Sequence, residues 1–502
     1  MYHFASHTNE IDNIHICKRV YFRLRISWFS FIIMSKLISQ ETFDDAVVEN
    51  IEEFEMSPEE ALDDALSQFK TQDVDLSLIV KDSQVYSSEN NGPVVHTSVK
   101  ITNQLKQFLA DDNINEVELE KLIMDFVEEC ADFAKSSLAG TNDAYTTLYK
   151  FLQKLQDSQN NKLLQRFINA VYVLLVGQSK LMKPTDTKYF LQLLELYRAD
   201  TDILLQTVKV ISTSCITNEA NKKSYIDGQI VSKAMDLLRT YKDEKELVKA
   251  ICSLFCVLTA DDDSSVPFGN AHETCRLIAT EDSGLLLILE LCKHYSKDNT
   301  ILKELFTTLP LLLVRNEFCQ QVYDFGGISF MATIFLDNLE NAPICSKTMT
   351  VFQCLARNDV VKDSIVTSGV VDIILMALSK HVSKPPVCEA GCALIGALAL
   401  RSPSNAKIIM TTTFPQLLVQ VMKSHPDSAR VQKSACIAVR NVVYHNSEYS
   451  GTFRDLEIAD LVNAVLAKHS TAYDEAKAAL RDLGCKVELK ELWKGEKGSI
   501  PQ

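Results

Sequence analysis

The feature that most constrains the fold of this chain is a repeat of about 43 residues. GGISFMATIF (326–335) and GVVDIILMAL (369–378) are similar to each other, follow similar lead-in segments, and begin 43 residues apart. The same period, extended in both directions, gives eight anchor positions at intervals of 42 to 55 residues. These anchors are Asp143, Asp186, Gln229, Gly284, Gly326, Gly369, Thr413 and Glu457.

Side chains in register with these anchors share one chemical character. All sixteen residues that lie five and eight positions after the anchors are apolar. In a chain that is 46% hydrophobic, a column of eight apolar residues arises by chance in about two of a thousand trials. Offsets of five and eight lie on one face of a helix. The pattern therefore predicts helical repeats that bury their apolar faces by stacking on their neighbours.

Composition supports an almost wholly helical chain. Only 15 glycines and 12 prolines occur in 502 residues, and the apolar runs lack the alternation of half-buried strands. A short helix, a turn and a longer helix within each period favour the armadillo type, with Gly284, Gly326 and Gly369 at the sharp bend. We predict an all-α, right-handed armadillo-type α-solenoid (an ARM/HEAT-like superhelix) of about eight repeats over residues 105–490, followed by a tail at 491–502.

The first 33 residues differ from the rest. Four basic residues precede an apolar run from Ile26 to Met34, which is too short to span a bilayer that needs about 20 residues. No small-residue cleavage site follows this run, although a signal peptide or a membrane tether stays an alternative. We expect residues 1–33 to be an extension that is disordered or a non-native start.

Residues 34–104 are predicted to form acidic amphipathic helices followed by a linker. Ser57-Pro58-Glu59-Glu60 is a good helix start, since Ser suits the N-cap position and Pro the first helical turn. From Glu41 to Asp75 there are 13 acidic residues and one basic residue. This segment is either a solvated helical hairpin or a docking element for a basic groove in cis or in trans.

Charge and cysteine content exclude several classes of function. The net charge of −15 disfavours binding to nucleic acid or to anionic membrane surfaces. The 14 cysteines form no Cys-x-x-Cys pair, so they fit buried apolar positions in a reducing compartment, the cytosol or the nucleus. No Walker loop, His-Glu-x-x-His or Gly-x-Ser-x-Gly motif occurs, and we expect no enzymatic activity and no cofactor.

One interval, between Gln229 and Gly284, is about 12 residues longer than the others and holds DDDSSVPFGNAHE (261–273). Insertions in one repeat project from the array and leave the stack intact. Asp clusters also stop and cap helices. The alternative is a metal-dependent activity at this insertion near 260–275, with weak candidate ligands Asp261, Asp263, His272 and Glu273.

Four segments carry a closer resemblance: SQETFDDAVVENIEEFEMSPEEALDDALSQF (39–69), TADDDSSVPFGNAH (259–272), RNEFCQQVYDFGG (315–327) and AKAALRDLGCKVELKELWKG (476–495). The chain resembles a member of the armadillo-repeat family from about Met34 to near its C-terminus. The resemblance implies a cytosolic protein that acts by contact with other proteins.

In that family the third helix of each repeat lines a groove, and nuclear-import receptors bind basic peptides there with Trp and Asn side chains. The two tryptophans, Trp28 and Trp493, lie at the ends of the chain, so an importin-like carrier is disfavoured. Recurring basic residues near the ends of the third helices either cap those helices or form a basic strip for an acidic segment. The candidate groove residues are Arg315, Arg357, Arg401, Arg440, Asn441 and His445.

We therefore expect a non-enzymatic scaffold that binds a protein partner in the groove of the array. Its partner is a polypeptide of unknown identity, with neither nucleic acid nor membrane as a ligand.

Overall fold

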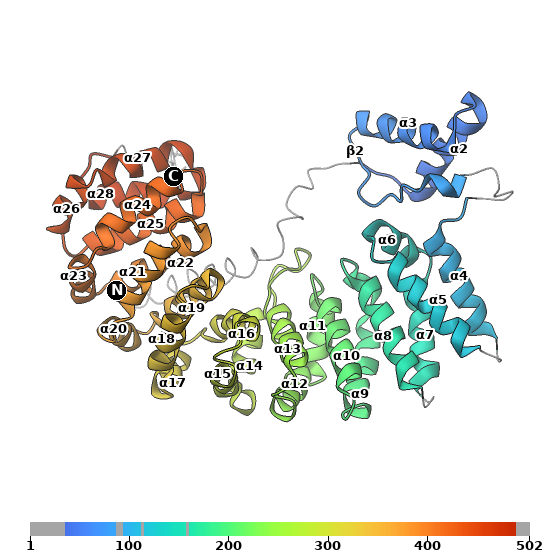
Figure 1. Ribbon diagram of the computed structural model, residues 1–502, viewed down its shortest axis with the longest axis horizontal. Coiled ribbons are helices and arrows are strands. Elements are labelled where there is room, and N and C mark those ends of the chain that lie inside the picture. The colour runs from blue at the N-terminus through green and yellow to red at the C-terminus, as the bar shows by residue number, and fades with distance from the viewer. Residues whose placement is uncertain (1–35, 87–93, 112–114, 157–159, 488–502) are drawn as a thin grey trace, which may run out of the picture. The chain divides into compact units, whose positions relative to one another are not determined.

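The computed structural model describes residues 36–86, 94–111, 115–156 and 160–487, and most of these residues lie in helices (Figure 1). The expectations for residues 1–33, the tail at 491–502 and both tryptophans concern positions outside the described residues. The chain divides into two compact units, residues 1–282 (unit 1) and 283–502 (unit 2). Each unit is described by itself.

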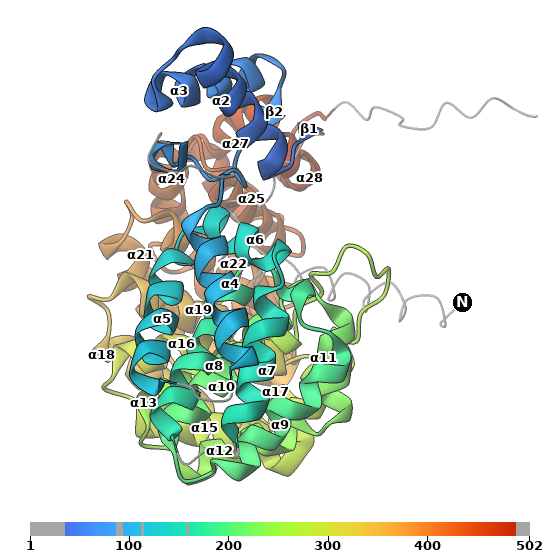
Figure 2. The same cartoon turned by 90° about the vertical axis from the view of Figure 1, so that its right-hand side faces the viewer.

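Residues 36–86 fold around a small core of their own. The helices α2 (Gln40–Phe54) and α3 (Pro58–Thr71) pack together, and the short parallel strands β1 (Lys36–Leu37) and β2 (Val74–Asp75) lie beside them (Figure 2). The start of α3 is as predicted, because Ser57 and Glu60 form a reciprocal capping box. Buried apolar residues of this N-terminal domain include Phe43, Val47, Ala61 and Ala65.

The prediction of a linker after Asp75 is wrong for much of the segment. Leu76, Ile79 and Val85 are buried in the core of the N-terminal domain, and the short 3-10 helix η1 (Ser83–Tyr86) follows. A regular helix, α4 (Thr97–Ala110), begins soon afterwards. The polar residues around 87–93 suggested a linker, but the apolar side chains before them have a core to enter.

Two helices, α4 and α5 (Glu116–Glu129), precede the first repeat and pack against its helices. Eight three-helix repeats follow within the described residues. The first helices are α6 (Phe133–Thr141), α11 (Glu219–Asp227), α14 (Ala271–Thr280), α17 (Asn316–Asp324), α20 (Asp359–Thr367), α23 (Pro403–Met410) and α26 (Tyr449–Asp455), with η2 (Ser179–Leu181) and η3 (Pro184–Asp186) in the second repeat.

The second and third helices are longer. The second helices are α7 (Ala144–Gln156), α9 (Thr187–Leu196), α12 (Ile230–Thr240), α15 (Gly284–His294), α18 (Gly327–Asp337), α21 (Val370–Lys380), α24 (Phe414–Ser424) and α27 (Ile458–Lys468). The third helices are α8 (Asn161–Leu175), α10 (Thr201–Ser214), α13 (Lys245–Leu258), α16 (Asn299–Leu312), α19 (Ala342–Leu355), α22 (Pro385–Ala399), α25 (Ala429–Val443) and α28 (Tyr473–Asp482). Short 3-10 turns, η4 (Glu281–Ser283) and η5 (Ser470–Ala472), precede α15 and α28.

The predicted anchors mark the starts of the eight second helices. Seven of them directly precede a second helix, and all sixteen apolar residues placed in register with the anchors are buried. One anchor is wrong by a residue, because Ser283 stands at the bend before α15 and Gly284 is the first helical residue. Burial of these two columns confirms that each second helix turns one apolar face into the array.

Glycine is less necessary at this bend than we expected. Gly326 and Gly369 have the left-handed backbone conformation there, but Asp143, Gln229, Ser283 and Glu457 adopt it as well. A non-glycine residue with positive φ carries a conformational cost, and the stacked helices on both sides of the bend offset it. For this reason the glycine signal is absent from most repeats although the bend is present.

Third helices stack side by side within each unit. In unit 2, α16, α19, α22, α25 and α28 contact one another in order, and the second helices α18, α21, α24 and α27 form a second layer (Figure 1). The helices α22 and α25 make extensive contact. A Cβ atom on Gly396 would lie 3.2 Å from Cγ2 of Ile437 and 3.4 Å from backbone atoms of Ala438, so glycine permits this approach.

Candidate functional site

The surface formed by the third helices of unit 2 combines exposed apolar and cationic side chains. Leu400 is 43% exposed and Tyr444 is 59% exposed, at the ends of α22 and α25. Arg401 and Arg440 are exposed near them, and Ile437 is half-buried. We call these five residues the third-helix face of unit 2. Aromatic and arginine side chains are the residues that most often dominate protein interfaces.

The predicted groove residues have several different roles. Arg357 follows α19, and its guanidinium donates a hydrogen bond to the carbonyl of Leu313 (3.1 Å), at the end of α16. Asn441 donates its amide to the carbonyl of Gly396 (2.8 Å) and thereby joins α25 to α22. Both side chains thus stabilise contacts between neighbouring repeats. Arg315 is the N-cap residue of α17, so it belongs to the start of a first helix and not to the end of a third helix. Its guanidinium lies 3.4 Å from the carboxylate of Glu317.

Ion pairs connect successive third helices along the same surface. Arg430 on α25 lies 3.5 Å from Glu389 on α22. Between α25 and α28, the guanidinium of Arg440 lies 3.7 Å from the carboxylate of Asp482, and Arg481 lies 2.8 Å from the same carboxylate. Two guanidinium groups therefore share one carboxylate and keep a net positive charge. Arg401 is exposed with a left-handed backbone, and the exposed His445 packs edge-on against Tyr444.

Charge is distributed unevenly along the chain. Unit 2 has 23 lysines and arginines and 22 acidic residues, so it is close to neutral. The excess of negative charge lies in unit 1, and residues 41–75 carry most of it. The third-helix face of unit 2 can therefore attract an acidic segment although the whole chain is acidic.

The inserted loop at 261–273 is attached to the first helix of the preceding repeat. Asp262 accepts a hydrogen bond from the backbone N–H of Thr217 (3.0 Å), and Asp263 accepts one from Glu219 (3.1 Å) at the start of α11. Negative side chains are favourable at a helix N-terminus. A hydrogen bond from Ser265 holds the pKa of Asp263 below its ordinary value. The Asp cluster thus caps a helix, which is one of the two roles considered for it, and the capped helix is α11.

A buried lysine completes this attachment. Lys222 on α11 is 1% exposed, and its Nζ donates to the carbonyl of Ala260 (2.7 Å) and to Asp262 (2.5 Å). Its charge is balanced by Asp262 and by Glu219, 3.6 Å away. Phe268 projects from the same loop and is 91% exposed. Lys222 therefore fixes the base of the insertion to the array while the tip stays in solvent.

The candidate metal ligands are not brought together. In the part of the chain that the structure describes, no three His, Cys, Asp or Glu side chains are grouped as a metal site would require. Asp263 is engaged by Ser265 and by the start of α11. His272 lies beside Glu273 at 3.8 Å on the exposed first turn of α14.

Sequence reasoning missed a buried polar network where the N-terminal domain meets α4. Asp44 accepts hydrogen bonds from Tyr86 (2.6 Å) and Gln40 (2.8 Å), and His96 lies 3.0 Å from the same carboxylate. Burial, with a further contribution from Asp44, raises the pKa of Tyr86 far above its ordinary value, so the phenol stays protonated and donates. Since His96 is the N-cap residue of α4, this network attaches the domain to the array.

It also missed a recurring contact between the ends of the second helices. In five repeats, the residue that follows the second helix reaches back to a main-chain carbonyl in the preceding repeat. We call this set of contacts the ring ladder, because a phenol or an imidazole makes each one. The pairs are Tyr197 with Gln156, Tyr241 with Arg198, His381 with Leu339, His425 with Val382, and His469 with Pro426.

The cysteines lie in the core, as we expected. All described cysteines are free thiols, and each is buried except Cys485. Burial raises the pKa of Cys215, Cys319 and Cys436 to about 12. These thiols are unreactive at neutral pH, because the thiolate is the nucleophile.

Comparison with known proteins identifies the family. The ARMC6 family model matches residues 99–501, and the model of the armadillo repeat-containing protein 6 N-terminal domain matches residues 35–96. The chain belongs to the armadillo repeat-containing protein 6 family. The boundary between the two models lies where the N-terminal domain ends and α4 begins.

Relatives match over almost their whole length. Armadillo repeat-containing protein 6 of Homo sapiens is 35% identical over 477 residues, covering 93% of this chain and 95% of that protein. The homologue of Drosophila melanogaster is 31% identical over 465 residues, covering 92% and 98%. An engineered protein of known crystal structure, 14% identical, superposes with a TM-score of 0.56 over 78% of this chain and 99% of that chain. The fold is an all-α armadillo-type solenoid. No helix in the described part of the chain has the length and hydropathy of a membrane-spanning segment.

Proposed function

We propose that this protein is a non-enzymatic scaffold of the cytosol or the nucleus that binds a protein partner on the third-helix face of unit 2. Membership of an armadillo-repeat family supports a protein-interaction role. The observation that carries the location is the exposure of Leu400 and Tyr444 beside Arg401 and Arg440. Exposed aromatic and arginine side chains on a rigid helical surface are what an interface needs.

The partner that this surface fits is an acidic polypeptide segment with an apolar residue. Arg440 shares Asp482 with Arg481, so part of its charge is available to a ligand. Arg401, which follows Leu400 at the end of α22, is exposed as well. An acidic segment gains from both cations, and an apolar side chain covers Leu400 and Tyr444. Importin-like binding of basic peptides does not fit these charges.

Quantitative affinity capture with the full chain tests the proposal. We expect a double variant, Leu400→Ala with Tyr444→Ala, to lose a defined partner from cytosolic extract. The matched control is Leu336→Ala with Met376→Ala, which removes two residues of similar exposure (49% and 50%) from the second helices. Retention of the same set of proteins by both double variants would contradict the proposed location.

A further inference from the structure

The inserted loop between α13 and α14 presents the most exposed large apolar side chain in the described part of the chain. Phe268 is 91% exposed, and Val117, the next in order, is 79% exposed. Figure 2 shows the loop in yellow-green, projecting beside α11. A single exposed apolar residue is ordinary on a protein surface. What distinguishes Phe268 is the way in which the loop around it is held.

Both ends of the loop are attached to one residue, Glu219, at the start of α11. The backbone N–H of Glu219 donates to the carboxylate of Asp263 (3.1 Å), and its own carboxylate accepts from the backbone N–H of Asn270 (3.1 Å). Gly269 packs closely here, because a Cβ atom on it would lie 2.9 Å from Oδ1 of Asp261 and 3.5 Å from the Glu219 carboxylate. The two ends of the loop are therefore fixed side by side on α11.

The loop is also held from within. The carboxylate of Asp263 accepts from the backbone N–H of Ser265 (3.0 Å), and its carbonyl accepts from the N–H of Val266 (3.1 Å). Val266 is half-buried, whereas Phe268 is turned into solvent. A side chain that is already held in place loses less conformational freedom when a partner binds it. The loop thus presents Phe268 as an anchor whose position is set before binding.

The base of the loop is negatively charged. Its carboxylates outnumber the cations that contact them, with Glu219, Asp261, Asp262, Asp263 and Glu273 on one side and Lys180, Lys222 and Arg276 on the other. A protein with basic side chains around its binding pocket is attracted to this base. An anionic lipid surface is repelled by it.

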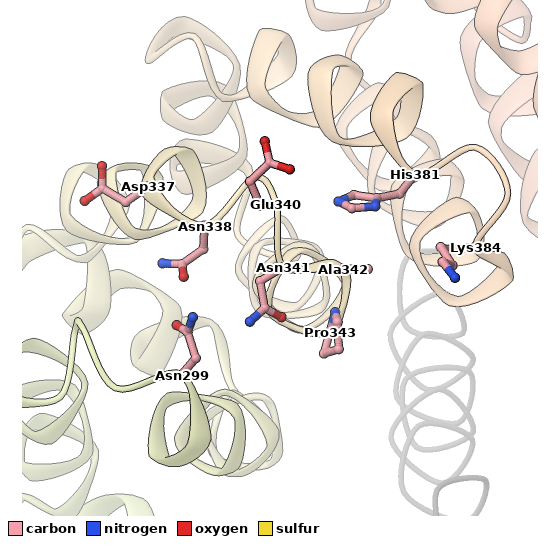
Figure 3. A pocket seen from close by; sticks show the side chains of 9 residues that line it. All are labelled: Asn299, Asp337, Asn338, Glu340, Asn341, Ala342, Pro343, His381 and Lys384. Carbon is pink, nitrogen blue, oxygen red and sulfur yellow. The ribbon is translucent and has the colours of Figure 1, made fainter.

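A second copy of this chain fits these requirements poorly. Unit 1 carries the excess of negative charge, so it repels the base of the loop. Figure 3 shows a hollow in unit 2, but the side chains that line it include Asn299, Asn338 and Lys384. A phenyl ring placed against such groups would remove water from them without supplying hydrogen bonds. The chemistry of the loop therefore favours a different protein as its partner.

We propose that the inserted loop is a binding element in which Phe268 enters an apolar pocket of a partner protein, and basic residues at the rim of that pocket face the carboxylates at the base of the loop. Aromatic side chains that fill a pocket are the residues that most often dominate a protein interface. This element lies on unit 1 and does not depend on the third-helix face of unit 2. A chain with both sites joins two proteins.

Photo-crosslinking in cells identifies what covers Phe268. The full chain carries p-benzoylphenylalanine in place of Phe268, and in a control chain in place of Val117. We expect a discrete adduct of one other protein at position 268 that does not form at position 117. Mass spectrometry should place the attachment among apolar side chains with lysine or arginine nearby. Adducts with lipid, with a second copy of this chain, or with no discrete protein would overturn the proposal.

Titration of the purified partner against variants of the full chain measures the contribution of the ring. Phe268→Ala should weaken binding about tenfold or more. Val117→Ala removes another highly exposed apolar side chain, from α5, and should leave binding unchanged. Raising NaCl from about 50 mM to about 300 mM should weaken binding severalfold, because salt screens the charges at the rim. Unchanged binding by Phe268→Ala, or binding that does not depend on salt, would overturn the proposal.

Two variants of Glu219 test whether the fixed shape of the loop matters. Glu219→Gln removes the charge but keeps an acceptor for the N–H of Asn270, whereas Glu219→Ala removes both. We expect Glu219→Ala to weaken binding about fivefold more than Glu219→Gln, because a freed loop must be ordered when the partner binds. Circular dichroism checks that both variants fold, and Phe268→Ala decides alone if they do not. Equal affinities of the two folded variants would overturn the role given to the attached loop.

Discussion

Replacement of Lys222 by methionine gives a sharp test of how the insertion is held. Lys222 donates to the carbonyl of Ala260 and to Asp262, and the Asp262 side chain is only 9% exposed. The substitution leaves that carboxylate without its cation, although the N–H of Thr217 still donates to it. Removal of one partner of a buried ion pair costs about 3 to 5 kcal/mol. We expect the lower end, about 3 kcal/mol, because one hydrogen bond remains.

Lys362→Met is the matched comparison. Lys362 occupies the corresponding place in repeat six, 2% exposed, and donates to the carbonyl of Leu400 (2.9 Å). Its carboxylate partner, Asp359, is 70% exposed, so it regains water when the lysine is removed. We expect a loss of about 1 kcal/mol, as for one hydrogen bond to a carbonyl. The free energy of unfolding should therefore differ by about 2 kcal/mol between the two variants.

Urea unfolding followed by circular dichroism measures these free energies. Repeat arrays can unfold in parts, so native-state hydrogen exchange of α11 and α13 supplies a local reading. Removing the stranded carboxylate as well, in a variant that combines Lys222→Met with Asp262→Leu, should recover part of the loss. A loss for Lys222→Met no larger than that for Lys362→Met would refute the reasoning.

Three further outcomes are expected. His425→Phe keeps the ring but removes the donor to the carbonyl of Val382 (2.6 Å), so thermal unfolding should show a loss of about 1 kcal/mol, and an unchanged midpoint would count against the ring ladder. Gly396→Val should separate α22 from α25 and lower stability by about 2 kcal/mol or more through overpacking; a wild-type urea midpoint would show that this close approach is not needed. Burial raises the pKa of Cys319 and Cys436 to about 12 in the folded state, against about 8.5 in an unfolded chain. The free energy of unfolding should therefore be highest below about pH 8.5 and should fall as the pH rises toward 12, because the unfolded chain loses these protons first. Urea midpoints that do not fall between pH 8 and pH 10.5 would contradict this.

Much of the fold was predictable, because apolar side chains recur in the sequence with the period of the array. Residues such as Leu148 and Met331 are apolar in the sequence and fully buried in the structure, since every repeat must cover its neighbour. The period also located the bend before each second helix, but the backbone conformation of the bend was harder to predict. Gln229 and Glu457 adopt a left-handed backbone conformation there, and their residue types do not predict it.

The polar contacts between repeats were not predictable in the same way. Lys222 lies on a polar helix and would be expected in solvent, yet its partners lie about 40 residues further along the chain. The ring ladder did leave a signal, because Tyr197, Tyr241, His381 and His425 stand in one register. That signal was weak, since phenol and imidazole rings perform the same task in different repeats and no single residue type recurs.

The central claim of this account is that a protein partner binds the third-helix face of unit 2. Hydrogen exchange of the full chain, with and without the partner that the capture experiment isolates, tests it most directly. We predict slower exchange at the ends of α22 and α25, around Leu400 and Tyr444, and no change in α18 and α21. Protection confined to the second helices, or no protection anywhere in the repeats, would contradict the claim.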